Sequence, residues 1–354
     1  ITINFKMNFS SIITNWYSIH KRSLPWRNTK EPYHIWLSEI ILQQTQITQG
    51  LPYYEAFVNK FPTVFDLANA KESEVLKLWQ GLGYYSRARN LHKTANYVAN
   101  ELNGTFPDTY TDLLKLKGIG DYTASAIASI CFNKPTAVVD GNVYRILSRY
   151  YGIETPINST EGIKEFKKLA TALIDKNNPA EHNQAIMEFG ARQCKPKNPD
   201  CSVCPFKNSC IALQKNSIDK LPVKLKKTKV SNKYYNFLVF ISSDKKTLFE
   251  KRTYKGIWQN LYQFPLIETK TPLNIDAFKA SAKVKSLLND ISFEFSLYNE
   301  KDIVHKLSHQ HLYTKFWIIE VDKLPSEGIR ISELTTFPTN ILISNFIDEF
   351  KFPI

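Results

Sequence analysis

The sequence predicts two domains, a mainly α N-terminal region and a smaller α+β domain that follows it. A length of 354 residues exceeds what one ordinary hydrophobic core supports. From about Ser10 to Leu213, apolar residues recur three and four positions apart with Pro or Gly at the breaks, which is typical of helices. After Tyr234 the pattern changes to short β-branched and aromatic runs separated by turn residues.

The C-terminal part has three runs with the composition of strands, at residues 234–240, 247–251 and 313–321. Between the second and third runs, residues 276–288 have the apolar period of a helix, so we expect at least one helix there. This mixture predicts an α+β domain.

The predicted domains span residues 8–217 and 233–354, and a basic linker at 218–232 joins them. The segment from Lys220 to Lys233 contains six lysines and no acidic residue, which is typical of an exposed linker. Its charge would also suit contact with DNA phosphates. Residues 1–6 precede Met7 and could be a remnant of upstream sequence.

The formal net charge is +13 and the pI is about 9.3, which favours a polyanionic partner, although basic proteins without such a partner are also common. The sequence contains no apolar run near the roughly 18–20 residues that cross a bilayer, and no signal-peptide pattern. We therefore expect no membrane partner and a cytoplasmic location.

Four of the five cysteines lie in one short loop, residues 194–210, with the spacing C-x6-C-x2-C-x5-C: Cys194, Cys201, Cys204 and Cys210. Thiolates are soft ligands, and four in a compact loop suit tetrahedral zinc or a [4Fe–4S] cluster. The spacing leaves both open, together with an electron-transfer role, and metal-free buried cysteines are the simplest alternative. Cys131 lies in an apolar helical run and is interpreted as core.

A Gly-x-Gly turn lies between two predicted helices at residues 113–124. Gly118 and Gly120 allow backbone amides to face outward at the start of the second helix, where the helix dipole favours an anion. This pattern predicts a helix–hairpin–helix that holds a DNA backbone without reading its sequence. A lone turn of this kind is often a tight connector, but here the cysteine loop follows it downstream.

These features resemble the endonuclease III superfamily, and most closely the adenine DNA glycosylases of the MutY type. The further motifs are LPWR at 24–27, WLSEIILQQT at 36–45, WQGLGYYSRAR at 79–89 and VDGNV at 139–143. The resemblance covers nearly all of the first 215 residues and continues more weakly beyond them. It implies a monomeric base-excision repair enzyme with a [4Fe–4S] cluster, acting on adenine mispaired with 8-oxoguanine or guanine in double-stranded DNA.

Two carboxylates are candidates for cleaving an N-glycosidic bond. Glu39 lies among apolar residues, which would raise its pKa towards neutrality and let it protonate a purine; a solvent-facing glutamate is the simplest alternative. Asp140 precedes a helical run, so it is either an N-cap or a carboxylate that stabilises a sugar cation. The resemblance implies that Asn142 and Tyr122 support this second carboxylate.

Tyr122 bears on the reaction outcome. In bifunctional relatives the corresponding residue is a lysine whose amine forms a Schiff base with the sugar and leads to strand cleavage, which tyrosine cannot do. The resemblance therefore implies a monofunctional glycosylase that uses water as the nucleophile.

The target base must leave the duplex to reach a pocket. The resemblance implies an adenine pocket and a set of DNA contacts. The pocket residues are Trp26, Arg27, Leu42 and Gln184. The DNA contacts comprise Gln44, Thr45 and Tyr84 near the vacated position and the hairpin glycines Gly118 and Gly120.

The second domain resembles the Nudix-like domain of the same family. The segment after Pro265 has no R-E-x-x-E-E cluster for magnesium, so we interpret the domain as a DNA binder without pyrophosphatase activity. The loop Leu307, Ser308 and His309 matches the family's 8-oxoguanine-recognition loop, in which Phe is frequent where this chain has Leu307.

The sequence leaves two other functions open. One is a related mismatch glycosylase, for example for thymine opposite guanine, which the base pocket would distinguish. The other is a DNA-binding iron–sulfur protein without catalytic activity, which the presence of both Glu39 and Asp140 disfavours.

Overall fold

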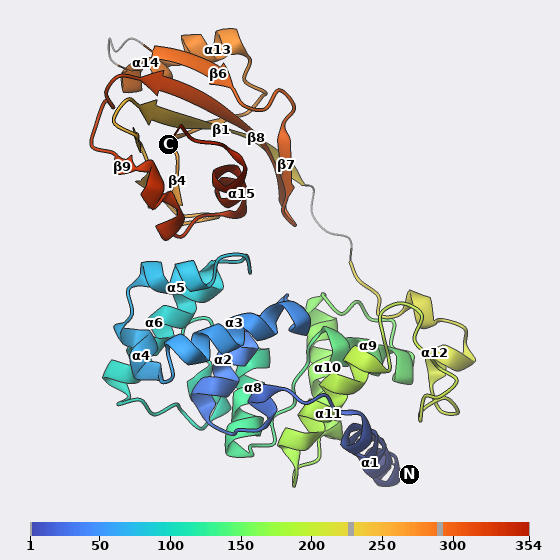
Figure 1. Ribbon diagram of the computed structural model, residues 1–354. Coiled ribbons are helices and arrows are strands. Elements are labelled where there is room, and N and C mark those ends of the chain that lie inside the picture. The colour runs from blue at the N-terminus through green and yellow to red at the C-terminus, as the bar shows by residue number, and fades with distance from the viewer. Residues whose placement is uncertain (1, 226–229, 289–292, 354) are drawn as a thin grey trace. The chain divides into compact units, whose positions relative to one another are not determined.

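A computed structural model describes residues 2–225, 230–288 and 293–353. The chain divides into two compact units, Ile1–Asn69 with Asn90–Lys226 and Ala70–Arg89 with Lys227–Ile354 (Figure 1). Three of the linker lysines, Lys226, Lys227 and Lys229, lie outside the described residues, and the boundaries proposed from the sequence stay a prediction. No helix in the described parts of the chain is long and apolar enough to cross a membrane.

The first unit is helical, as the sequence predicts, and its described residues contain no strand. Its elements are α1 (Thr2–His20), η1 (Pro25–Arg27), α2 (Pro32–Leu42), α3 (Ile47–Lys60), α4 (Val64–Asn69), α7 (Tyr110–Leu113), α8 (Asp121–Phe132), α9 (Gly141–Tyr151), α10 (Thr160–Leu173), α11 (Pro179–Arg192), α12 (Ile211–Gln214) and η2 (Ile218–Lys220). Helix α6 (Ser86–Glu101) begins in the second unit and ends in the first.

The core of the first unit forms where α2 and α11 pack against α8 (Figure 1). Residues 123–130 of α8 are buried on every side of the helix, which marks a central helix rather than an amphipathic one. The helices around it begin at side-chain caps and end at residues with a left-handed backbone. Ser159 accepts from the Gly162 backbone N–H at the start of α10, and Gly152 closes α9 at φ 65°.

The expected helix–hairpin–helix is formed by α7, the turn at 114–120 and α8. Gly118 has a φ of 82°, and a Cβ there would lie 2.8 Å from the Cβ of Asn90, so only glycine fits. Gly120 is the N-cap of α8, and a Cβ there would meet no atom within 4 Å. The start of α8 is therefore open to an approaching anion.

The second unit has an α+β fold. Its elements are α5 (Glu72–Leu78), β1 (Ser231–Ser242), β2 (Lys246–Thr247), β3 (Glu250–Lys251), β4 (Tyr262–Gln263), β5 (Leu266–Thr269), α13 (Ile275–Ala280), α14 (Ala282–Leu288), β6 (Phe293–Leu297), β7 (Ile303–Lys306), β8 (Gln310–Val321), β9 (Ile329–Arg330), η3 (Ile331–Thr336) and α15 (Ile341–Glu349). Where the sequence suggests one helix at 276–288, the structure has two, because the chain turns out of the helical conformation at Ser281 (ψ 120°).

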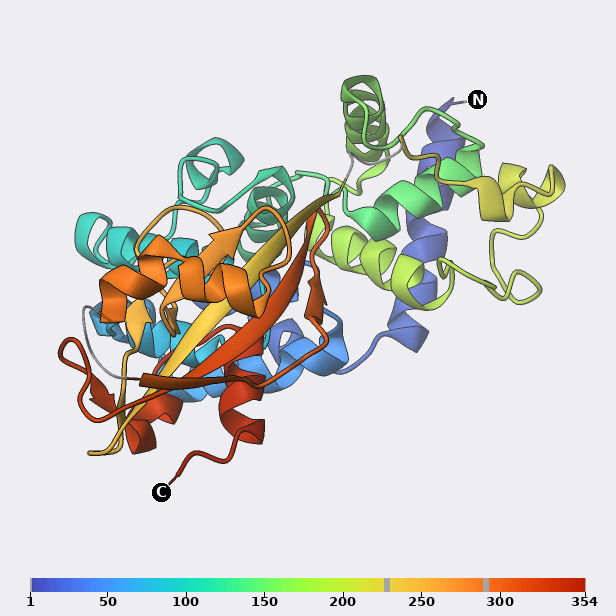
Figure 2. The same cartoon turned by 90° about the horizontal axis from the view of Figure 1, so that it is seen from above.

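The main sheet has the strand order β5–β1–β8–β6, and β7 also pairs with β8. Strands β1 and β8 run parallel, with Phe237 opposite Phe316. Helices cover both faces of this sheet (Figures 1 and 2). On one face the Trp317 ring stacks on Phe278 of α13 with centroids 4.0 Å apart, and on the other Phe316 stacks on Phe346 of α15 at 4.2 Å.

Candidate active site

Glu39 lies on the central helix α2, deep among protein atoms, while its side chain keeps some solvent-accessible surface. Its neighbours in sequence, Leu37, Ile40 and Ile41, are buried. Burial raises the pKa of Glu39 to about 7; a hydrogen bond with Tyr122 opposes the rise, and the charge of Asp140 adds to it. Glu39 is thus a carboxyl group that exchanges a proton near neutral pH.

Tyr122 stands in the first turn of α8 and faces this carboxyl. Burial and the two nearby carboxylates, Glu39 and Asp140, raise its pKa well above the usual value, so the phenol stays protonated. Its hydroxyl also lies 3.2 Å from the sulfur of Met187 on α11. In the next position, the hydroxyl of Thr123 accepts from the amide of Gln43 at 3.2 Å.

Asp140 is the N-cap of α9, and both of its oxygens accept hydrogen bonds. The backbone N–H groups of Asn142 and Val143 donate to Oδ1 at 2.9 and 2.8 Å, and the Asn142 side-chain amide donates to Oδ2 at 2.8 Å. Burial raises the pKa of Asp140, and these donors act in the opposite direction. Because every contact around it is a donor, the hydrogen bonding suits a carboxylate.

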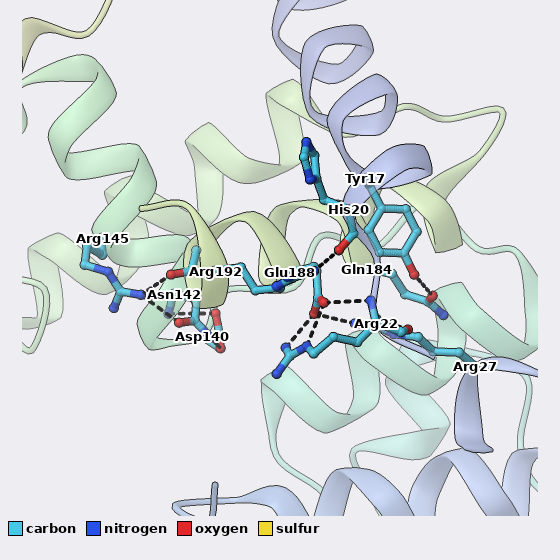
Figure 3. Close-up of polar contacts among 11 residues, drawn as sticks. Tyr17, His20, Arg22, Arg27, Asp140, Asn142, Arg145, Gln184, Glu188 and Arg192 are labelled. Atoms are coloured by element: carbon cyan, nitrogen blue, oxygen red, sulfur yellow. Dashed lines mark hydrogen bonds and ion pairs between the residues drawn. The ribbon is translucent and has the colours of Figure 1, made fainter. Parts of the chain in front are cut away.

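Arg145 extends this set of contacts towards the cysteine loop (Figure 3). Its guanidinium donates to the Asn142 side-chain oxygen at 2.8 Å, to the Gly190 carbonyl at 2.6 Å and to the Cys194 carbonyl at 2.7 Å. Gly190 permits the close approach of α11, since a Cβ there would lie 2.6 Å from the Cβ of Asn142. The orientation of Asn142 is therefore set from α11 and from the start of the loop.

A buried glutamate, which the sequence analysis did not single out, organises the other end of the site (Figure 3). Glu188 accepts from Arg22 at 2.6 Å and from Arg27 at 2.7 Å. Burial would raise its pKa, but the hydrogen bonds from Arg22 and Arg27 outweigh burial and hold the value at about 2. Glu188 lies one turn after Gln184 on α11, a spacing that could have indicated it.

Tyr17 of α1 joins this group. Its hydroxyl donates to the Gln184 side-chain oxygen at 2.7 Å, and the Arg27 guanidinium lies over its ring at 5.4 Å (Figure 3). This hydrogen bond fixes the Gln184 oxygen towards Tyr17. Tyr17 was also not singled out from the sequence, because it lies 167 positions from its partner.

Arg27 and Gln184 line the same cavity of about 460 Å³. Its lining is Tyr17, Lys21, Arg22, Ser23, Arg27, Asn28, Thr29, Lys30, Ile130, Asn133, Asn178, Ala180, Glu181 and Gln184. The other two predicted pocket residues lie elsewhere. Trp26 is buried edge-on against Tyr54 at 5.0 Å, and Leu42 packs where Gly50 leaves room for it. The structure thus brings together two of the four residues at this cavity.

Two of the predicted DNA contacts have unusual backbone conformations. Gln44 has a φ of 57° and Tyr84 a φ of 46°, in the left-handed region that non-glycine residues rarely occupy, and both are exposed. Thr45 follows Gln44, and its hydroxyl bonds back to the Gln43 carbonyl at 3.3 Å. Positive φ angles also occur at other non-glycine residues, such as Lys245 and Asn260, and the DNA-binding role of Gln44 and Tyr84 stays a prediction.

The second unit contains its own cavity of about 490 Å³. The lining is Leu82, Gly83, Tyr84, Tyr85, Ser86, Arg89, Gly256, Ile257, Trp258, His305, Lys306, Leu307, Ser308 and His309. The loop 307–309 is a tight connection between β7 and β8, closed by the Leu307 N–H donating to the Gln310 carbonyl at 2.8 Å. Burial lowers the pKa of His305, so a neutral imidazole faces the Trp258 ring.

The four cysteines of the loop 194–210 influence one another electrostatically. Burial raises the pKa of the Cys204 thiol to about 11, and Cys194, Cys201 and Cys210 add to the rise. Arg149 approaches the Cys194 sulfur at 3.5 Å and donates to the next carbonyl at 2.7 Å. Four soft thiols in one loop fit a cluster with one thiolate per iron. Across the described residues, no three such ligands are gathered closely enough for a single metal ion.

The fold and the site together define a helix–hairpin–helix DNA glycosylase. The family model for HhH-GPD superfamily base excision DNA repair proteins matches residues 37–171, and a NUDIX domain model matches 236–348. The adenine DNA glycosylase of Buchnera aphidicola subsp. Schizaphis graminum is 38% identical over 294 residues, covering 80% of this chain and 84% of the relative. That of Buchnera aphidicola subsp. Baizongia pistaciae is 37% identical, covering 88% and 86%.

The chain belongs to the adenine DNA glycosylase family, which acts on DNA in base excision repair. Among solved structures, a thermostable thymine-DNA glycosylase is 30% identical with a TM-score of 0.56, and the alignment covers 60% of this chain and 99% of that one. That alignment spans less of the chain than either Buchnera relative does. Family membership therefore favours adenine over thymine as the excised base.

Proposed function

We propose that this enzyme hydrolyses the N-glycosidic bond of adenine mispaired with 8-oxoguanine or guanine in double-stranded DNA. The observation that carries the proposal is the pair of carboxyl groups in one site with different environments. Glu39 has a pKa of about 7 in a buried setting, while Asp140 is surrounded by three N–H donors. Burial raises the pKa of both carboxyls, but the three donors favour the charged form of Asp140, so Glu39 suits the role of acid and Asp140 that of anion.

Glu39 acts as the general acid. Burial raises its pKa to about 7, so the carboxyl can carry a proton near neutral pH. Transfer of that proton to a ring nitrogen of the extruded adenine makes the base a better leaving group. Tyr122, which is protonated and hydrogen-bonded to Glu39, holds the carboxyl in place.

Asp140 stabilises the oxocarbenium-like sugar that forms as the base departs. Asn142 orients this carboxylate, and Arg145 orients Asn142. Water then attacks the sugar and gives a proton to the Glu39 carboxylate, which restores the acid for the next turnover. Tyr122 stands where bifunctional relatives have lysine and has no amine to form an imine, so the reaction ends with an abasic site and an uncut strand.

Substrate recognition is divided between the two units. In the first, the open start of α8 at Gly118 and Gly120 holds a phosphate, and Arg27 and Gln184, which line one cavity, contact the adenine. Trp26 and Leu42 lie outside the lining of that cavity, and their place in the pocket rests on the resemblance alone. Gln44 of the first unit and Tyr84 of the second fill the duplex near the vacated position, and Thr45 contacts the DNA. In the second unit, the loop Leu307, Ser308 and His309 recognises the 8-oxoguanine.

We further propose that Cys194, Cys201, Cys204 and Cys210 hold a [4Fe–4S] cluster. When bound, such a cluster cross-links the loop that presents the basic residues Lys195 and Lys207. Arg149 stabilises this loop through its contacts with the Cys194 sulfur and the Lys195 carbonyl. We place the enzyme in the reducing cytoplasm, as a monomer on DNA.

Base release from a panel of duplexes tests this function. The panel pairs 8-oxoguanine with A, C, G or T, and guanine with A or T, and each reaction is read with and without alkali to separate base removal from strand cleavage. We expect alkali-dependent cleavage at A opposite 8-oxoguanine and opposite guanine. Release of thymine opposite guanine in place of adenine would contradict the proposal.

A further inference from the structure

The exposed Tyr84 is carried on a turn with an unusual backbone. Gly81, Gly83 and Tyr84 all have positive φ angles, of 104°, 69° and 46°. Glycine adopts these angles without penalty, but tyrosine does not, because its Cβ crowds the backbone there. With 58% of its surface exposed, Tyr84 has little packing around it to hold this conformation. Other residues must therefore stabilise the turn.

Arg87 makes several contacts with this turn from the first turn of α6. Its backbone N–H donates to the Tyr84 carbonyl at 2.9 Å. Its guanidinium donates to the carbonyls of Leu82 at 3.3 Å and Gly83 at 3.4 Å. The buried Trp79 donates from its indole nitrogen to the same Gly83 carbonyl at 3.0 Å.

The Arg87 guanidinium also lies close to both of the neighbouring aromatic rings. Its central carbon is 5.0 Å from the centre of the Trp79 ring and 5.7 Å from that of Tyr84. Burial lowers the pKa of Arg87 to about 10, which still leaves it charged at neutral pH. A charged planar group at these distances attracts the face of an aromatic ring. Arg87 therefore links a fixed ring, Trp79, to an exposed one.

We propose that Arg87 is a positioning residue that presents the Tyr84 ring to the duplex in a fixed orientation. The inference rests on the proposed role of Tyr84 at the vacated base position. Tyr84 and the loop 307–309 line the same cavity of the second unit, so the setting of its ring also determines the space left for the opposite base. Loss of Arg87 acts through Tyr84 and leaves the acid Glu39 unchanged.

A double-mutant cycle tests this directly. Single-turnover adenine release is measured for the wild type, Arg87→Leu, Tyr84→Leu and the double variant, on duplexes with A opposite 8-oxoguanine. The expected result is a roughly 3- to 30-fold slower release for Arg87→Leu, the range of a cation–π contact. In the Tyr84→Leu background the same change should alter the rate by less than about twofold, since the ring that Arg87 positions is gone.

Direct phosphate binding by Arg87 is the main competing explanation. In that case Arg87→Leu would lower the salt dependence of DNA affinity by about one counterion, whether or not Tyr84 is present. The control is Arg330→Leu, which removes the same charge from an exposed position on β9. Equal slowing by Arg87→Leu in both backgrounds, or a lower salt slope than that of Arg330→Leu, would overturn the proposal.

If Arg87→Leu does not fold, Arg87→Lys takes its place in the cycle. Lysine keeps the charge but lacks the planar group that spans two carbonyls and two rings, so it should restore only part of the rate. Full restoration by lysine would also contradict the proposal. A wild-type enzyme that released no adenine would instead show that the proposed function is wrong.

Discussion

The Asn142 side chain joins Asp140 to Arg145, donating to the carboxylate at 2.8 Å and accepting from the guanidinium at 2.8 Å. Asp140 therefore depends on α11 and on the first cysteine of the loop, although it lies on α9. The guanidinium makes its other contacts with the Gly141, Gly190 and Cys194 carbonyls. The proposed cation stabiliser is thus held by donors of α9, and one of these donors is anchored through Arg145 to α11 and the cysteine loop.

Arg145→Leu should slow adenine release by roughly 10- to 100-fold, because a hydrogen bond to a charged group contributes about 1.5–3 kcal/mol. Single-turnover kinetics measure this effect. Arg145→Lys is the matched control, because it retains the charge without the fork that reaches four oxygens, and it should recover only part of the loss. A rate unchanged by Arg145→Leu would show that Asp140 does not rely on this contact.

The Glu188 ion pairs predict a pH dependence of stability. The pKa of Glu188 is about 2 in the fold, against an ordinary value of 4.5, so its charge stabilises the fold above about pH 4.5 and this stabilisation is lost as the pH falls towards 2. Glu188→Gln should lower the free energy of unfolding at neutral pH by about 2 to 3 kcal/mol. Urea unfolding at several pH values measures it.

The matched control for this change is Glu181→Gln, on the same helix but exposed, which should cost little. The difference between the two variants should shrink as the pH falls from about 4.5 towards 2, because the unfolded chain takes up a proton at Glu188 before the folded protein does. Equal destabilisation by both variants at neutral pH would show that the Glu188 contacts with Arg22 and Arg27 do not stabilise the fold.

The absence of a lysine at position 122 predicts no Schiff base. Sodium borohydride added during turnover should trap almost no covalent enzyme–DNA complex, and abasic product should remain uncut until alkali is added. A bifunctional glycosylase run in parallel is the positive control. Trapping as abundant as with that enzyme would contradict a water-dependent reaction.

Removing the side chains of Ser308 and His309 should reduce the enzyme's selectivity for the base opposite adenine. The double variant Ser308→Ala with His309→Ala removes the hydrogen-bonding groups of the loop, so adenine opposite 8-oxoguanine should lose its advantage over adenine opposite guanine. The ratio of the two single-turnover rates measures this. Because both side chains are exposed, the melting temperature should stay nearly constant. A preserved ratio would exclude the loop from recognition.

Local patterns were enough to predict the fold class, but for Glu39 they left a solvent-facing side chain open, and the family resemblance decided for burial. Apolar neighbours on α2 indicate burial, and burial raises its pKa, as the structure shows. The break at Ser281 was not predicted, because the apolar period continues through it. Arg22 and Tyr17 escaped notice because their partners lie 166 and 167 positions away, and only tertiary packing brings them together.

The left-handed backbones of Gln44 and Tyr84 also could not be derived from residue type, since glutamine and tyrosine ordinarily avoid that region. Neighbouring glycines at 81 and 83 hint at the turn but not at the conformation of the tyrosine itself. The resemblance to a family suggested what these residues contact. It did not indicate that Arg87 and Trp79 hold one of them.

The rate of adenine release across about pH 6 to 9, for the wild type and Glu39→Gln, tests the central claim most directly. If Glu39 delivers the proton, wild-type single-turnover rates should fall as the pH rises through about 7, where the carboxyl loses its proton. Glu39→Gln should be slower by at least about 100-fold and independent of pH over that range. A Glu39→Gln enzyme that releases adenine at the wild-type rate would contradict the account.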